Sequence, residues 1–333
     1  MNNNNNNNNN KTYIIAEIGI NHEGDIDICK EMIRASARCG VDAVKLQTVN
    51  PDKNYVKGTE SYNIFKGAEL TREETREAFK FAQGLGLDIF TTSGDIETID
   101  WVEKLNPSHW KVSSGLITHI PVIRYLASLK RPLLISTGMA NEFDIDTAID
   151  AAMLAGAEDI SLLQCTSVYP TPFEEVNLST IAWLKNKYNI PVGFSDHSIG
   201  DDAIFLSISA GASLIEKHFS LDNQREGFDH KISLNAEGLK KMVERVRLAE
   251  IIMGNQKKEV SSLVQAARDS FLRYIVAISP IAEGDIFSKN NIGVKRTMPG
   301  VAGITPKDFD NLLGVVSDKK YDVDDIISIK NLR

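Results

Sequence analysis

Cysteine is scarce in this chain of 333 residues, and the three that occur, Cys29, Cys39 and Cys165, show no CxxC spacing. An odd, scattered set of this kind is typical of reduced thiols and not of a disulfide framework. No apolar run reaches the roughly 18 residues of a membrane span. The start of the chain also lacks the basic and apolar regions of a signal peptide. We therefore expect a cytoplasmic protein with no membrane partner.

An excess of basic residues is also missing. The chain has 37 Lys and Arg against 45 Asp and Glu, which gives a formal net charge of −8. Because nucleic-acid binding needs a basic face, we expect no nucleic-acid partner. A local cluster of lysines can still bind a small anion. The length predicts about two domains.

Short apolar, β-branched runs alternate along the chain with longer amphipathic segments of helical period. The strand candidates are Tyr13–Gly19, Asp42–Thr48, Asp88–Thr92, Trp110–Ser114, Pro132–Thr137, Asp159–Thr166, Pro191–Asp196 and Ser213–His218. Eight strands alternating with helices over about 240 residues predict a closed (β/α)8 barrel, an α/β TIM barrel. The alternative is a doubly wound open sheet, which would be expected to carry a glycine-rich nucleotide turn after its first strand. No such turn is present.

The pattern predicts four consecutive segments. Residues 1–11 are an asparagine tract with nothing to bury, which we interpret as disordered or artefactual. Residues 12–255 form the barrel, and residues 256–272 form a polar, helix-prone linker. Residues 273–333 form a small β-rich domain, with strands expected at Tyr274–Ser279, Asp285–Phe287 and Ile326–Ile329.

Two lysines lie inside apolar strands of the predicted barrel. Lys45 and Lys111 are flanked by apolar residues, and a buried ammonium group costs free energy unless it meets an anion. One interpretation is an internal ion pair with Glu17 or Glu216. The other is a pair of ammonium groups around a phosphate or carboxylate, assisted by the hydroxyls of Thr92, Ser114 and Ser136.

Two histidines end neighbouring strands, so their rings can meet at the mouth of the barrel. Neutral imidazoles such as those of His197 and His218 suit a divalent metal ion, including manganese, zinc or iron. Hydrogen-bonded histidines with no metal remain equally compatible with the spacing. His22 either braces the turn after the first strand or contacts a ligand, and His230 is either a ligand or a surface residue.

These residues lie in motifs that resemble the N-acetylneuraminate (sialic acid) synthase family, which includes legionaminic and pseudaminic acid synthases. The matching stretches are AEIGINHEG (16–24), VKLQT (44–48), WKVSSG (110–115), ISTGM (135–139), CTSVYPTP (165–172), GFSDHS (193–198) and EKHFSLD (216–222). VKRTMPGVAGI (294–304) resembles the antifreeze-like (SAF) domain that follows the barrel in this family. The match extends over nearly all of residues 12–333.

The resemblance implies a (β/α)8 barrel followed by the SAF domain, in a domain-swapped homodimer. It implies a transferase that condenses phosphoenolpyruvate with an N-acetylated hexose to give a nine-carbon 2-keto sugar acid and free phosphate. A divalent metal, Mn²⁺ or Mg²⁺, is implied as the cofactor. Two alternatives stay open: another metal-dependent barrel aldolase or epimerase acting on a sugar phosphate, and a degenerate barrel that carries an ice-binding domain.

The resemblance also implies a role for each matching residue. The metal ligands are His197 and His218, with Glu17 beside the metal and the reacting aldehyde. The phosphoenolpyruvate site comprises Lys45, Thr92, Lys111, Ser114, Ser136 and Ser195. Gln47, Tyr169 and Asp229 face the sugar, Ser167 of the CTS motif joins the substrate-binding set, and Arg296 reaches the sugar site of the partner subunit. Leu116 and Phe228 depart from the residues that members often carry on the sugar side, so the acceptor sugar stays open.

Overall fold

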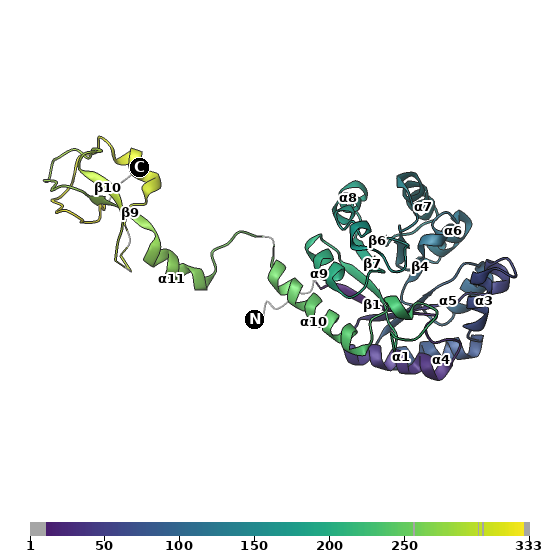
Figure 1. Ribbon diagram of the computed structural model, residues 1–333. Helices are drawn as coiled ribbons and strands as arrows, with labels where there is room; N and C mark the ends of the chain where they lie inside the picture. The colour runs from purple at the N-terminus through teal and green to yellow at the C-terminus, as the bar shows by residue number, and fades with distance from the viewer. Residues whose placement is uncertain (1–10, 256, 299, 302, 330–333) are drawn as a thin grey trace. The chain divides into compact units, whose positions relative to one another are not determined.

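The computed structural model describes residues 11–329 except 256, 299 and 302. The asparagine tract, apart from Lys11, lies outside the described residues. The contacts within the chain separate two compact units, with the boundary between Gly254 and Asn255 (Figure 1). Each unit is described by itself below.

The first unit is a closed barrel of eight parallel strands in sequence order, which confirms the predicted (β/α)8 fold. The strands are β1 (Tyr13–Gly19), β2 (Ala43–Gln47), β3 (Asp88–Thr92), β4 (Trp110–Val112), β5 (Leu133–Ser136), β6 (Ile160–Cys165), β7 (Val192–Asp196) and β8 (Leu214–His218). They coincide with the predicted strands to within two residues at each end. No gap is left in the sheet, because β8 pairs with β1 from Tyr13 opposite Leu214 to Glu17 opposite His218.

Helices surround the barrel on its outside (Figure 1). They are α1 (Ile26–Cys39), α4 (Arg72–Gly84), α5 (Ile96–Glu103), α6 (Ile120–Ser128), α7 (Glu142–Leu154), α8 (Ser179–Tyr188), α9 (Asp202–Ser209) and α10 (Ala236–Met253). Helix α4 begins at the predicted capping box, in which Thr71 and Glu74 satisfy each other's backbone N–H groups. Helix α1 buries Cys29, Met32 and Ile33 on one face, and this apolar face holds it against the strands.

Two short helices that the sequence pattern did not indicate lie between β2 and α4. They are α2 (Pro51–Asn54) and α3 (Glu60–Gly67), capped by the side chains of Asn50 and Thr59. Helix α3 buries none of its residues, so no strong hydrophobic period marks it in the sequence. This β2–α4 segment takes part in both cavities described below.

An apolar floor fills the lower part of the barrel interior. It comprises Ile15, Ala43, Phe90, Leu134, Leu163 and Leu214. Side chains alternate across a strand, so the residue two positions further along also points inward, one layer nearer the carboxyl ends. That step leads to Glu17, Lys45, Thr92, Ser136, Cys165 and Glu216. The fold therefore places a polar layer directly above the apolar floor.

The second unit contains a two-stranded antiparallel sheet of β9 (Arg273–Ala277) and β10 (Ile292–Arg296). Helix α11 (Ser262–Phe271) precedes it and α12 (Phe309–Leu312) follows it, so the predicted linker contains a helix. Strand β10 was not predicted. The strands expected at Asp285–Phe287 and Ile326–Ile329 are wrong, because each region contributes only a single-residue bridge, Ile286 to Val316 and Ile326 to Val276. A small core around Ile275, Phe287 and Tyr321 holds this unit together.

Within the described residues, no helix is both long enough and apolar enough to cross a bilayer.

Candidate active site

A cavity of about 440 Å³ opens at the carboxyl ends of the barrel strands, within the size range of small-molecule sites. Thirteen predicted site residues line it: Glu17, Lys45, Gln47, Thr92, Lys111, Ser114, Ser136, Ser167, Tyr169, Ser195, His197, His218 and Asp229. They come from all eight strands or from the loops that follow them. The structure thus brings together every predicted residue of the barrel, and their chemical roles stay predictions.

Four buried charges occupy the polar layer of the cavity. The Lys45 Nζ atom lies 2.8 Å from a Glu17 carboxylate oxygen and 3.8 Å from one of Glu216. The Lys111 Nζ atom donates to Glu216 at 3.0 Å, and the Ser195 hydroxyl donates to the same oxygen at 2.9 Å. Both lysines therefore have the internal carboxylate partners that one interpretation of the sequence expected. The four charges balance, which makes their burial tolerable.

The two carboxyl groups of this cluster differ in their proton affinity. Burial is the main influence on Glu17 and raises its pKa to about 7, although Lys45 opposes the shift. Burial also acts on Glu216, but Lys111 and Lys45 outweigh it and lower the pKa of that carboxyl to about 2. Near neutral pH, Glu216 is an anion and Glu17 can gain or lose a proton.

Several hydroxyl groups in the cavity have no partner in the described part of the chain. Thr92 Oγ1, Ser136 Oγ and Ser167 Oγ are buried and make no hydrogen bond. Ser114 Oγ instead accepts a hydrogen bond from the Gly138 backbone N–H at 3.0 Å. Buried hydroxyls are normally hydrogen-bonded, so three free ones beside two lysines indicate a site for the oxygen atoms of an anion.

The two histidines face each other across the mouth of the cavity, with ring centroids 5.3 Å apart. His197 Nδ1 lies 2.9 Å from the Thr166 carbonyl oxygen. This contact assigns the proton to Nδ1 and leaves the lone pair of Nε2 available. His218 Nδ1 is buried without a hydrogen-bond partner and lies 3.6 Å from an Asp229 carboxylate oxygen. Burial lowers the pKa of both histidines, so both rings are neutral near pH 7.

Comparison with known proteins identifies the family of this chain. The model of the NeuB family matches residues 32–258. The chain belongs to the NeuB family. It is 33% identical to the N,N'-diacetyllegionaminic acid synthase of Campylobacter jejuni, over 95% of this chain and 99% of that protein. It is also 33% identical to a pseudaminic acid synthase of Campylobacter jejuni, over 97% of each chain.

Solved structures include a close fold match within the same group. The N-acetylneuraminic acid (sialic acid) synthetase of Leptospira borgpetersenii, crystallised with citrate, superposes with a TM-score of 0.75 at 30% identity. The match covers 79% of this chain and 93% of that one. The resemblance noted in the sequence is therefore confirmed at the level of the family and of the barrel fold.

The cavity of this NeuB family member has further lining residues that the sequence did not indicate. Tyr55 and Phe65 from the β2–α4 segment stack on each other with centroids 5.0 Å apart, and both line the cavity together with Met139 and Leu116. Helices α2 and α3 show no clear hydrophobic period in the sequence. The sequence therefore did not indicate that this aromatic pair lines the cavity. Leu116 was noted in the sequence only as a departure from the family pattern.

The loops after β1 and β8 are joined beside the cavity. The Asn21 side chain donates to the Phe219 carbonyl oxygen at 2.9 Å and accepts from the Asp229 backbone N–H at 3.1 Å. His230 is buried between Glu23 and Ser220, with contacts of 2.9 and 2.8 Å. It is therefore neither a surface residue nor part of the cavity lining. This network holds Asp229 near His218.

An ion pair lies on the outer face of the same two strands that carry the histidines. Lys217 Nζ donates to Asp196 at 2.8 Å and to the Ser198 carbonyl oxygen at 2.5 Å. Both side chains are fully buried between the barrel and its helices. Because Asp196 precedes His197 and Lys217 precedes His218, the pair fixes the two strand ends from which the histidines project.

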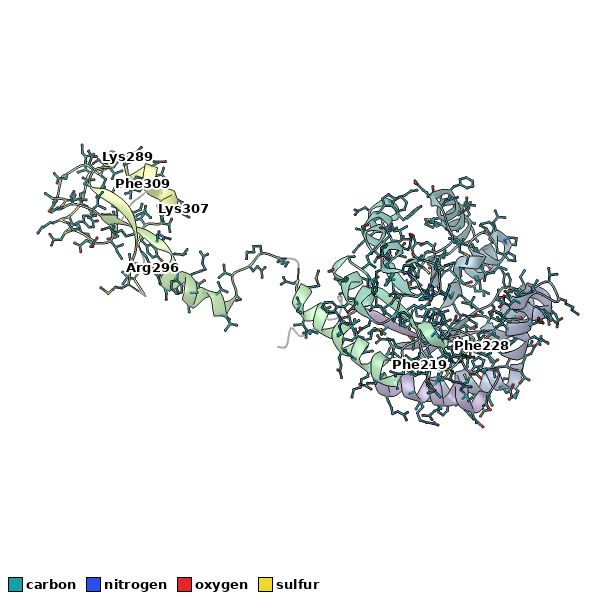
Figure 2. The ribbon with its side chains drawn as sticks, viewed as in Figure 1. Phe219, Phe228, Lys289, Arg296, Lys307 and Phe309 are labelled. Carbon is teal, nitrogen blue, oxygen red and sulfur yellow. The ribbon has the colours of Figure 1, made fainter. Side chains whose placement is uncertain are left out.

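Arg296 belongs to the second unit and is not part of the barrel cavity. It lies at the end of β10 (Figure 2), where its guanidinium stacks on the Phe271 ring at 4.0 Å and its Nε donates to the Ser270 carbonyl oxygen at 3.1 Å. These contacts tie β10 to the end of α11. The predicted role of Arg296 at a partner's sugar site stays a prediction.

Proposed function

We propose that this chain condenses phosphoenolpyruvate with an unphosphorylated N-acylated hexose, giving a nine-carbon 2-keto sugar acid and free phosphate. One observation carries the proposal: two buried lysines and three unpartnered hydroxyls lie beside two neutral imidazoles in a single cavity. The related proteins named as legionaminic and pseudaminic acid synthases support the same reaction class.

The phosphoenolpyruvate anion would bind between Lys45 and Lys111. Both ammonium groups point into the cavity, and the free hydroxyls of Thr92, Ser136 and Ser167 can donate to phosphate or carboxylate oxygens. Little water reaches these buried groups, so each donor contributes more to binding than it would at the surface. Ser195 keeps Glu216 in place beneath the lysines.

His197 and His218 fit a divalent metal ion as two nitrogen ligands. The lone pair on His197 Nε2 and a ring nitrogen of the neutral His218 imidazole would be the donors that such an ion needs. Among the described residues, no group of three or more His, Cys, Asp or Glu could hold a metal, so water and substrate would complete the coordination. Two nitrogen donors favour Mn²⁺ over Mg²⁺, which prefers oxygen ligands. When bound, the ion supplies Lewis-acid polarisation of the acceptor carbonyl.

The residues of the chain then account for the remaining steps. C3 of phosphoenolpyruvate forms a bond to the aldehyde carbon of the acceptor as the carbonyl π bond opens to an alkoxide, and positive charge develops at C2. Water adds to C2 and gives its proton to Glu17, whose raised pKa suits a base near neutral pH. Cleavage of the C2–O bond to phosphate then releases phosphate, which takes the proton of the C2 hydroxyl as that group becomes the 2-keto group. The proton held by Glu17 passes to the alkoxide at the former aldehyde carbon. Lys45 and Lys111 balance the negative charge of the carboxylate and phosphate throughout.

The rest of the cavity lining favours an acceptor with apolar substituents and no phosphate. The active-site cavity has apolar lining surface from Leu116, Met139 and Tyr55. Among the described residues that line this cavity, the basic side chains are those of Lys45 and Lys111. Both are assigned here to phosphoenolpyruvate. A second phosphate group would therefore meet no further lysine or arginine of the described cavity lining.

The second unit would complete the acceptor site from a neighbouring subunit. We assign residues 273–333 to an antiparallel, antifreeze-like domain in a domain-swapped homodimer. Arg296 would then contact the N-acyl group of the acceptor bound in the partner barrel. The exposed position of this residue at the end of β10 supports the assignment.

The test is phosphate release from phosphoenolpyruvate in the presence of Mn²⁺, with a panel of N-acetylated hexoses and 2,4-diacetamido-6-deoxy hexoses. We expect release that depends on one class of sugar, and loss of that release in Lys111→Met. Absence of phosphoenolpyruvate binding to the wild-type chain would refute the proposal. Covalent trapping of a sugar on Lys45 by borohydride would instead indicate a Schiff-base aldolase.

A further inference from the structure

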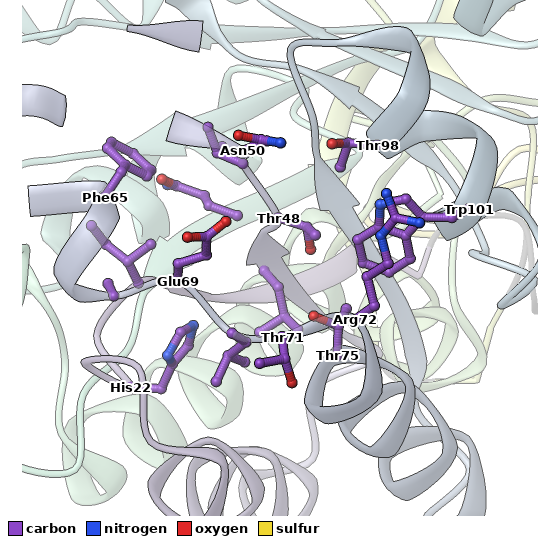
Figure 3. Close-up of a pocket in the computed structure, with 16 residues that line it drawn as sticks. His22, Thr48, Asn50, Phe65, Glu69, Thr71, Arg72, Thr75, Thr98 and Trp101 are labelled. Carbon is purple, nitrogen blue, oxygen red and sulfur yellow. The ribbon is translucent and has the colours of Figure 1, made fainter. Parts of the chain in front are cut away.

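A second cavity of about 300 Å³ lies behind one wall of the proposed active site. It is bounded by the end of β2, the β2–α4 segment and helices α4 and α5 (Figure 3). Gln47, Val49 and Phe65 line both cavities, so these side chains form the wall between them. Neither the sequence motifs nor the proposed reaction uses the second cavity.

Most polar groups of this cavity are neutral, and two hydroxyls and one amide group among them make no hydrogen bond within the described residues. Thr75 and Thr98 are 1% and 4% exposed, and neither hydroxyl has a hydrogen-bond partner among the described residues. The Asn50 side chain uses its oxygen as the cap of α2, which leaves its NH₂ group free to donate into the cavity. Burial lowers the pKa of His22 to about 4, so this ring adds no charge near pH 7. Neither threonine oxygen is among the fully buried atoms without a partner, so both hydroxyls are accessible from the cavity and available to a polar ligand.

Aromatic rings form two sides of the cavity. Figure 3 shows Phe65, Glu69 and Asn50 on one side, with Thr98 and Trp101 across from them. The Arg72 guanidinium stacks on the Trp101 ring at 5.5 Å and is also paired with Glu97 at 2.8 Å. Glu69 is likewise neutralised by Lys66 at 2.6 Å. The two charged side chains at this site are therefore already matched, and no net charge is left for a charged ligand.

We infer that this cavity is a second binding site for one neutral sugar ring. Its volume fits a monosaccharide, its walls offer aromatic surface, and its free groups are hydroxyl and amide donors. The inference concerns binding at a place separate from the reaction and does not depend on the proposed condensation. The sugar can be a second molecule of an N-acetylated hexose or a plain hexose, which share this chemistry.

Gln47 provides a route by which an occupied second site affects the first. Its Nε2 atom donates to Glu17 at 2.9 Å, and its side chain also lines the second cavity. A sugar that hydrogen-bonds the Gln47 carbonyl oxygen would hold the amide in the orientation that donates to Glu17. This effect, unlike the binding itself, rests on the proposed function: occupancy of the second site is expected to change the KM of the acceptor without adding a catalytic group.

Trp101 makes the inference testable, because it lines the second cavity and not the first. The chain has three tryptophans, so Trp110→Phe with Trp183→Phe leaves Trp101 as the single reporter. We expect N-acetylmannosamine or glucose to change its fluorescence saturably, with a Kd on the order of 1 mM. Adding Thr75→Val and Thr98→Val preserves side-chain shape and should weaken this binding about tenfold.

Three results would overturn the inference. The first is Trp101 fluorescence that stays constant with both sugars at concentrations up to about fifty times the expected Kd. The second is a fluorescence titration that is unchanged in the variant with both valine substitutions. The third is a fluorescence response to a sugar acid but to neither neutral sugar. Phosphate release measured in parallel separates this outcome from the proposed function. Release that persists without any Trp101 response would refute the second site only, and a Trp101 response without release would refute the condensation only. A response to glucose but not to N-acetylmannosamine would identify the plain hexose as the ligand.

Discussion

Glu17 and Glu216 flank the same ammonium group, that of Lys45, at 2.8 and 3.8 Å. The pKa of Glu17 is raised to about 7 and that of Glu216 is lowered to about 2. The difference follows from Lys111, which bonds Glu216 and leaves Glu17 with Lys45 and the neutral Gln47 amide. Two carboxyl groups in one cavity with separated pKa values indicate one permanent anion and one group that exchanges a proton.

This separation predicts the pH dependence of the reaction. The base form of Glu17 is the ionised carboxylate, and a raised pKa means that protonation removes it as the pH falls below about 7. We expect kcat/KM to decline about tenfold per pH unit on the acidic side. Glu17→Gln should lower the rate at pH 8 and abolish this acidic limb. An acidic limb that persists unchanged in Glu17→Gln would show that another group titrates.

The unpartnered hydroxyl of Ser136 predicts a binding effect without a folding effect. Ser136→Ala removes a donor that bonds nothing in the described chain, so the free energy of unfolding should stay within about 0.5 kcal/mol. The Kd of phosphoenolpyruvate, measured by calorimetry, should rise about tenfold. Ser36→Ala is the matched control, because Ser36 has an equally buried and unpartnered hydroxyl on α1. Equal effects of both substitutions on the Kd would contradict the assignment.

The two-histidine arrangement predicts a specific loss of metal binding. His218→Ala should abolish saturable Mn²⁺ binding, followed by electron paramagnetic resonance, and reduce turnover to background. His230→Gln provides the comparison, since His230 is also buried but bonds Glu23 and Ser220 outside the cavity. That variant should lose stability by about 1–3 kcal/mol and keep its Mn²⁺ affinity. Full activity of His218→Ala would refute the metal site.

The position of Arg296 predicts an effect on the acceptor alone. Arg296→Ala, tested in the full chain, should raise the KM of the sugar about tenfold or more and leave the KM of phosphoenolpyruvate unchanged. Lys307→Ala, elsewhere in the second unit, should change neither. An unchanged KM for the sugar in Arg296→Ala would contradict the assignment of the second unit to the acceptor site.

The barrel and its polar layer were predictable from the sequence because both follow from short-range patterns. The alternation of strands and helices indicated eight βα repeats, and lysines within apolar strands such as the one at Lys45 stood out against the expected burial cost. The motifs supplied the roles that spacing alone left open. The surface alternative for His230 was excluded only by three-dimensional contacts, which bury it between Glu23 and Ser220. The metal role of His197 and His218 stays a proposal.

The parts that were not predicted depend on contacts between distant residues. Strand β10 contains a glycine and two basic residues, so its extended form comes from pairing with β9 and not from its own composition. Ile286 and Ile326 lie in apolar runs typical of strands, yet each makes only one bridge. Tyr55 and Phe65 reach the cavity because the β2–α4 segment folds over it, which no local period indicates.

The Asp196–Lys217 ion pair also determines which register the last two strands can adopt. Side chains alternate between the two faces of a strand, so a slip of β8 by one residue would exchange every inward group for its outward neighbour. Such a slip would turn Lys217 toward the cavity and Glu216 and His218 away from it. It would also leave the buried Asp196 carboxylate without its Lys217 partner, at a cost of about 3–5 kcal/mol. The Asp196–Lys217 ion pair does not face the cavity. It nevertheless favours the strand pairing in which both imidazoles line the cavity.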